Sequence, residues 1–197
     1  MLQIVKDYFW IIDFSISLFI LCVICVLYYK KYISYFIWLL FWAGVLTGFI
    51  WEITLTLIDV FNIANIFIFN LKPPVHYIFI VISHSLWDGS LFIIGVGIIY
   101  LFLNKPHFIS FKFSEILILI IWSQIQSIII EIISIQSGGW MYKPLWWNPV
   151  LFFIKDKPVT LLPQFIWLIG CIIFYSTALL IHKSLYKQFI VFSPQNK

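Results

Sequence analysis

The sequence predicts an all-α, polytopic membrane protein built as a bundle of five transmembrane helices. Three observations lead to this fold class: 63% of the 197 residues are hydrophobic, only 10% are charged, and the mean hydropathy is +1.05. Soluble domains contain about 25% charged residues, so the composition excludes a water-soluble globule. The length suits a single domain over residues 1–197.

Five apolar segments are long enough to cross a bilayer, for which a helix needs about 20 residues. We expect spans at about 8–29, 35–59, 77–103, 114–135 and 160–181. Residues typical of helix ends separate them, in chain order Lys30-Lys31, Pro73-Pro74, Asn104-Lys105-Pro106, Gly138-Gly139 and, at the start of the last span, Pro158 and Pro163.

The distribution of lysine predicts the orientation. An odd number of spans puts the termini on opposite sides, and the side of the C-terminus carries more lysines than the other. Cytoplasmic loops are enriched in Lys and Arg, so we expect a cytosolic C-terminus. A net charge of +4 spread over short loops does not predict a nucleic-acid partner.

Seven polar or ionisable side chains interrupt the apolar spans: Glu52, His84, Asp88, Gln124, Ser127, Glu131 and Gln164. A charge at the centre of a spanning helix costs roughly 2.5–3.5 kcal/mol, so such residues usually face the protein interior and mark a function. At about 1.5 Å of rise per residue, all seven fall in the same half of the membrane, next to the outer loops. The other half is almost entirely apolar.

These residues also share helical faces. Three stripes are apparent: His84 with Asp88, then Gln124 with Ser127 and Glu131, then Gly48 with Glu52, Thr56 and Asp59. The glycine would admit a neighbouring helix. A pocket for a ligand is one interpretation, and hydrogen bonds that only join the helices are the alternative.

We assign Glu52, His84, Asp88 and Glu131 as candidate catalytic residues. Glu131 stands alone on its stripe and Asp88 lies beside a histidine, so the first is expected to act as acid and the second as base. A single histidine with carboxylates is a poor zinc or iron ligand set, so neither a metal nor another cofactor is expected. The other histidines, His76, His107 and His182, are expected to be solvated.

Aromatic residues crowd the fourth loop, where Trp140, Tyr142, Trp146 and Trp147 lie close together. They could form an aromatic belt at the membrane surface. The alternative is a lid over the polar pocket, hinged at Gly138-Gly139. On that interpretation the substrate-binding residues are Gln124, Ser127, Trp140, Trp146, Trp147, Gln164 and Trp167.

Several short motifs resemble the EXPERA superfamily, the relatives of emopamil-binding protein, the sterol Δ8–Δ7 isomerase. They are Phe49-Ile50-Trp51-Glu52, Leu86-Trp87 followed by Gly89, Ser123-Gln124-Ile125, Pro144-Leu145 and Gln164-x-x-Trp167. The last motif has Asn in the family. The family also has His at the position of Gly48 and Glu near Ile80.

The resemblance implies a pocket for a sterol or another isoprenoid lipid. Glu52 and Gln124 would line it, and Gln164 and Trp167 would accompany a carbocation. We therefore expect a polar and aromatic intramembrane pocket for such a lipid, and acid–base double-bond isomerisation is the candidate reaction that the resemblance implies. A non-catalytic protein that binds or moves sterols or lipophilic amines is the alternative, and a proton-coupled transporter is disfavoured because one membrane half lacks polar residues. A homodimer stays open.

Overall fold

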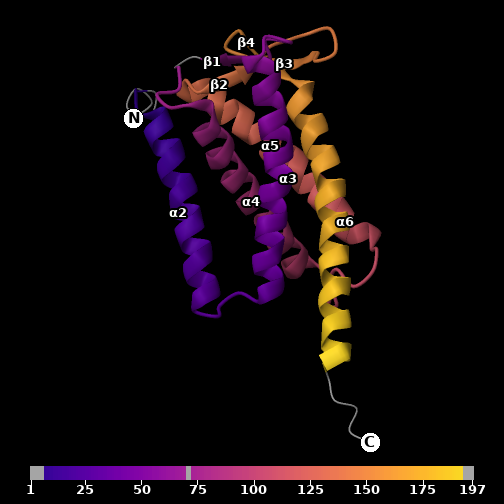
Figure 1. The fold of residues 1–197 in the computed structure, drawn as a ribbon. Helices are drawn as coiled ribbons and strands as arrows, with labels where there is room; N and C mark the ends of the chain where they lie inside the picture. The colour runs from indigo at the N-terminus through magenta and orange to yellow at the C-terminus, as the bar shows by residue number, and fades with distance from the viewer. Residues whose placement is uncertain (1–6, 70–71, 193–197) are drawn as a thin grey trace, which may run out of the picture.

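Five long helices run back and forth along the molecule (Figure 1), in a computed structural model that describes residues 7–69 and 72–192. They are α2 Phe9–Tyr29, α3 Tyr35–Val60, α4 Tyr77–Phe102, α5 Phe113–Ser137 and α6 Leu161–Phe192. All five are long and apolar enough to cross a membrane. The all-α fold class and the five predicted spans are therefore confirmed.

The helix ends lie close to the predicted ones except at α6. This helix continues to Phe192, beyond the predicted end near residue 181. The prediction followed the apolar run, and the helix goes on through the polar residues His182, Lys183 and Lys187 after that run ends. Gly138 ends α5 in the left-handed conformation, with φ 81°, which a residue without a side chain adopts at little cost. At the start of α3, the Ser34 side chain accepts a hydrogen bond from the Ile37 amide.

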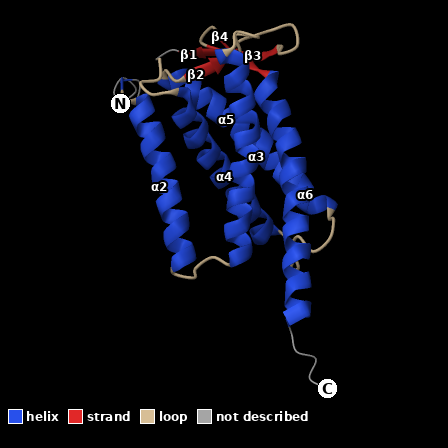
Figure 2. Cartoon of the chain, viewed as in Figure 1, coloured by secondary structure: helices blue, strands red, loops and turns tan. Residues whose placement is uncertain are grey.

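Four short strands, absent from the predicted fold, gather at one end of the bundle (Figure 2). β1 Phe67–Phe69 pairs antiparallel with β2 Trp140–Tyr142, and β3 Val150–Ile154 pairs with β4 Lys157–Thr160. They belong to the loops that follow α3 and α5. The polar residues that line the main cavity lie at this strand-bearing end.

The tightest helix pair is α3 with α4. Gly44 and Gly89 face each other so closely that a Cβ at Gly44 would lie 3.1 Å from the Cα of Gly89. Toward the other end, the main apolar core joins α3, α4, α5 and α6 around Phe92 and Phe174, whose rings stack at 4.4 Å. α2 packs mainly on α4.

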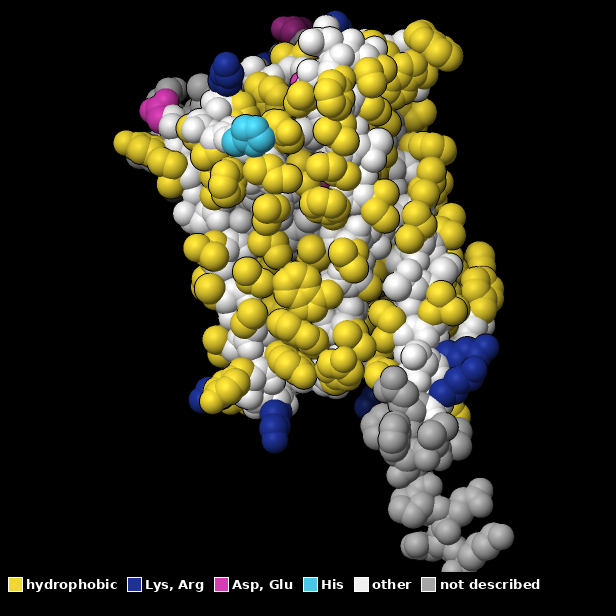
Figure 3. Space-filling view, in the orientation of Figure 1, with side chains coloured by type: hydrophobic (Ala, Val, Ile, Leu, Met, Phe, Trp, Pro, Cys, Tyr) yellow, Lys and Arg dark blue, Asp and Glu magenta, His cyan; other side chains and the backbone are white. Residues whose placement is uncertain are grey.

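The surface matches a membrane environment. The visible face is covered with hydrophobic side chains along its middle, and lysines lie only toward its two ends (Figure 3). Exposed apolar residues such as Leu18, Phe19 and Ile94 are therefore suited to contact lipid rather than water. The protein is a multi-pass membrane protein.

Candidate functional site

A cavity of about 370 Å³ opens among the helices at the strand-bearing end. All five helices and β2 contribute to it. Its polar wall contains Asp13, Glu52, His84, Asp88, Ser127 and Glu131. Its aromatic wall contains Phe9, Trp51, Trp87, Trp140, Tyr142 and Trp167. Seven of the predicted site residues thus lie around one space: Glu52, His84, Asp88, Ser127, Glu131, Trp140 and Trp167.

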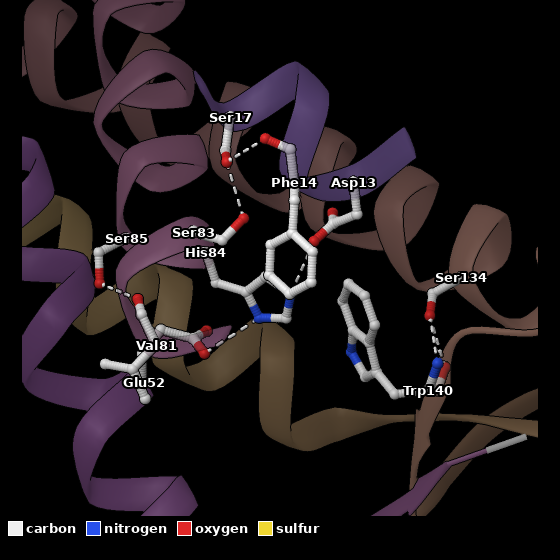
Figure 4. A network of polar contacts seen from close by, with 10 residues as sticks. All are labelled: Asp13, Phe14, Ser17, Glu52, Val81, Ser83, His84, Ser85, Ser134 and Trp140. Carbon is white, nitrogen blue, oxygen red and sulfur yellow. Dashed lines mark hydrogen bonds and ion pairs between the residues drawn. The ribbon is translucent and has the colours of Figure 1, made fainter. Parts of the chain in front are cut away.

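His84 lies between two carboxylates from neighbouring helices (Figure 4). Its Nδ1 is 3.3 Å from Glu52 Oε2 on α3, and its Nε2 is 3.5 Å from Asp13 Oδ2 on α2. The three side chains therefore form a carboxyl–imidazole–carboxyl link across three helices.

Aromatic rings cover this link. The Trp140 ring centroid lies 4.6 Å from that of His84, and the Trp10 ring lies nearly parallel to the imidazole at 6.4 Å. Such faces attract a cation. The expected contact between His84 and Asp88 on one face of α4 gives way to these partners, because α2 and α3 lie against that face and bring carboxylates to both ring nitrogens.

Asp88 is buried against the backbone of α3. A Cβ at Gly48 would lie 2.6 Å from the Asp88 Cβ, so the glycine on the predicted α3 stripe makes room for this carboxyl group. Asp88 Oδ2 has no hydrogen-bond partner within the described part of the chain. It is a buried acceptor beside the cavity.

Glu131 is held by the start of α6 and the end of β4. Its Oε1 accepts hydrogen bonds from the Thr160 amide at 3.0 Å and the Thr160 hydroxyl at 3.3 Å. Its Oε2 is buried and meets no donor among the described residues. One carboxyl oxygen is therefore fixed in place while the other is left for the cavity.

The two predicted glutamines lie behind the cavity wall. Gln164 Nε2 donates to Ser127 Oγ at 3.2 Å, and Gln124 Nε2 donates to the Gln164 carbonyl at 3.1 Å. Neither glutamine belongs to the cavity lining, because their amides join α5 to α6; their assignment to substrate binding stays a prediction. Ser127 and Trp167 do line it, and the Trp167 ring lies 5.3 Å from that of Trp51.

Of the three tryptophans of the proposed lid, Trp140 alone lines the cavity. Trp146 is 94% exposed and Trp147 is 39% exposed, and neither lines the cavity. Asn148 fixes this loop, because its side chain donates to the Lys143 carbonyl and accepts from the Leu162 amide. Trp140 is held at the cavity because it belongs to β2. Its backbone amide donates a hydrogen bond to the Ser134 hydroxyl oxygen, and its carbonyl accepts one from the same hydroxyl.

Sequence reasoning missed Asp13 and placed Tyr142 only within the aromatic cluster of the fourth loop. Asp13 is the one acidic residue within the first predicted span, so the rule that selected Glu52 would have found it. Tyr142 lies outside the spans, at the end of β2. Burial raises the pKa of its phenol well above the usual value, and the negative charge of Glu52 adds to the effect. It is therefore a neutral hydrogen-bond donor at the cavity.

A second buried polar cluster lies at the opposite end. Glu115 is fully buried and accepts hydrogen bonds from the Phe108 amide and the Tyr175 hydroxyl, with His107 Nδ1 3.7 Å away. The expectations that His107 is solvated and that this membrane half lacks polar groups are therefore wrong. The carboxylate fixes the loop between α4 and α5. His76 is exposed and caps α4, and His182 is half-buried.

No group of three or more His, Cys, Asp or Glu side chains is placed to hold a metal ion in residues 7–69 and 72–192. Comparisons of the chain with models of protein families, with curated proteins and with solved structures found no match.

Proposed function

We propose that this membrane protein binds a sterol or another isoprenoid lipid in the cavity and moves its double bond by acid–base chemistry. One observation carries the proposal: buried carboxyl oxygens of Asp88 and Glu131 that lack hydrogen-bond donors lie around the same apolar, aromatic space. Purely structural polar groups in a membrane are expected to be paired.

The chemistry needs two carboxyl groups in different roles. Glu131, fixed through Oε1, donates a proton from Oε2 to one carbon of the double bond, and the neighbouring carbon becomes a carbocation. Asp88 removes a proton from the carbon on the other side of the cation, and the electron pair of that C–H bond forms the new double bond. The lipid gains one proton and loses one, so no oxidant or reductant is required.

The remaining cavity residues steady the cation. The faces of Trp51, Trp140 and Trp167 surround the space, and an aromatic face attracts a cation by about 0.5–2 kcal/mol, more where water is excluded. Glu52 and Asp13 hold His84 in place and supply negative charge. A proton passed back from Asp88 to Glu131 after product release restores the starting state.

The resemblance to the EXPERA superfamily supports the pocket more than the residue roles. Glu52 and Trp167, two positions the resemblance assigns to the pocket, line the cavity, whereas Gln124 and Gln164 do not. The family's histidine is replaced by Gly48, and the Asp88 carboxyl occupies that space. The proposed mechanism therefore uses Asp88 as base. The distribution of lysine supports a cytosolic C-terminus.

Non-catalytic binding of a lipophilic amine is the second candidate. The unpaired oxygens of Asp88 and Glu131 next to tryptophan faces are also suited to an ammonium group. In that case the ligand is bound and released without any chemical change to the ligand.

The experiment incubates the purified protein in lipid nanodiscs with cholest-8-en-3β-ol in D₂O and analyses the extracted lipid by mass spectrometry. A double-bond isomer carrying one deuterium is expected from the parent, and Glu131→Gln and Asp88→Asn, checked for folding, abolish its formation. Asp156→Asn, an exposed acid in the turn between β3 and β4, serves as the control and retains activity. Recovery of bound but unchanged lipid would support the binding protein, and no binding at all would refute both candidates.

A further inference from the structure

A second, smaller cavity adjoins the first at the strand-bearing end. Its volume is about 160 Å³. Glu52, His84, Trp140 and Tyr142 line both cavities, so these four side chains form the wall between them. The polar residues found only in the smaller cavity are Thr56, Asp59, Lys72 and Tyr77.

We propose that the smaller cavity binds the polar head of the lipid, and that this head is an uncharged hydroxyl group. The inference rests on the proposed function, because it requires the rest of the same lipid to occupy the larger cavity.

The α3 stripe sets the position of the head. Glu52, Thr56 and Asp59 follow each other at intervals of four and three residues and all line the smaller cavity. One helical turn, about 5.4 Å, separates Thr56 from Glu52. A hydroxyl group beside Thr56 therefore lies one turn from the shared wall, and an attached hydrocarbon skeleton passes Glu52 and His84 into the larger cavity.

The charges in the smaller cavity favour an uncharged head. Two acidic side chains, Glu52 and Asp59, line it together with two basic ones, Lys72 and His84. Asp59 is fixed in place because its Oδ1 accepts hydrogen bonds from the amides of Ile66 and Phe67. The lining therefore offers no excess positive charge to a phosphate or sulfate, whereas a hydroxyl group can donate to the Thr56 oxygen or to a carboxylate and accept from Tyr142.

The two-stranded sheet of β1 and β2 forms the cover. Phe67 pairs with Tyr142 and Phe69 pairs with Trp140, and all four side chains line the smaller cavity. Since side chains of alternate residues point to the same face of a strand, this pairing directs four rings to the cavity. The rings exclude water around the head, which strengthens each hydrogen bond made there.

The test measures equilibrium binding of radiolabelled cholest-8-en-3β-ol, its methyl ether and its sulfate ester to the parent, Thr56→Val and Thr54→Val. Thr54 is the matched control, because it lies two residues away on α3, is exposed and donates to the Ile50 carbonyl. The parent is expected to bind the alcohol more tightly than the ether and the sulfate.

Thr56→Val is expected to weaken binding of the alcohol about three- to tenfold, the range of one net hydrogen bond, and to leave the ether unchanged. Thr54→Val changes neither. Equal effects of Thr56→Val on alcohol and ether, no effect on either, or a sulfate that binds at least as tightly as the alcohol, would overturn the inference while leaving the lipid cavity in place. A parent that binds none of the three would refute the proposed function itself.

Discussion

Replacing Gly48 by alanine tests the contact between α3 and the Asp88 carboxyl group. The added Cβ would lie 2.6 Å from Asp88 Cβ and 2.9 Å from its Cγ. The first distance is 0.8 Å shorter than the 3.4 Å at which ordinary van der Waals contact begins. The Asp88 Oδ2 lies nearer still and could turn aside, but the Asp88 Cβ is fixed to the backbone of α4, so α3 and α4 must separate.

The expected cost follows from overpacking. Adding a methyl group to a packed core costs about 1–3 kcal/mol, and Ala recovers about 1 kcal/mol of intrinsic helix propensity relative to Gly. Gly97 on α4 provides the control, because a Cβ there would meet no atom within 4 Å. Gly97→Ala gains the same propensity without the collision.

The assay is unfolding in mixed micelles by titration with sodium dodecyl sulfate, followed by far-ultraviolet circular dichroism. Gly48→Ala is expected to be less stable than Gly97→Ala by about 1–3 kcal/mol. Equal unfolding midpoints for the two variants would refute the close approach of α3 to Asp88. It would also remove the explanation for glycine at this position.

Three further predictions follow from the same geometry. Trp140→Ala is expected to weaken lipid binding about tenfold or more through loss of a cavity wall, while Trp146→Ala leaves it unchanged because that ring is exposed; the reverse order in a binding assay would contradict the placement. Glu115→Ala is expected to lower the free energy of unfolding by about 3 kcal/mol, with Glu115→Gln milder, because a buried ion pair and its hydrogen bonds are lost; unchanged unfolding midpoints would contradict it. The parent and Tyr142→Phe are expected to show the same tyrosinate absorbance at 295 nm up to pH 10, because burial keeps the Tyr142 phenol protonated as pH rises. A lower absorbance of the variant than of the parent below pH 10 would show that Tyr142 ionises normally.

The helices and the level of the polar groups were predictable from local rules. A bilayer requires about 20 apolar residues per span, and the fixed rise per residue placed Glu52, His84, Asp88 and Glu131 at one depth. These four residues line one cavity. Their chemical roles stay predictions, because position alone does not establish a reaction.

The partners of these residues were not predictable, because they depend on how each helix is rotated against its neighbours. His84 turned to Asp13 and Glu52 on other helices rather than to Asp88 one turn away. Gln164 lies at the predicted depth but points to Ser127 instead of the cavity. The periodicity of the sequence predicts which residues share one face of a helix. The packing of the neighbouring helices determines which side chains that face contacts.

The loops were the least predictable part. β1 and β2 contain three residues each, too few for an alternating pattern to stand out from an apolar sequence. Trp140 and Trp146 belong to the same cluster in the sequence, but Trp140 lines the cavity and Trp146 is exposed. That difference is set by the strand pairing of Trp140 and by the hydrogen bonds of Asn148, which are non-local.

Lipid protection of a cysteine at Ser127 tests most directly whether the spans enclose a lipid-binding cavity. In a background with Cys22, Cys25 and Cys171 changed to Ser, Ser127→Cys lies in the cavity wall, and Ser176→Cys on the exposed side of α6 is the control. We expect cholest-8-en-3β-ol to slow labelling of Ser127→Cys by a membrane-permeant maleimide and to leave Ser176→Cys unaffected. Equal labelling rates with and without the lipid at both positions would contradict the account.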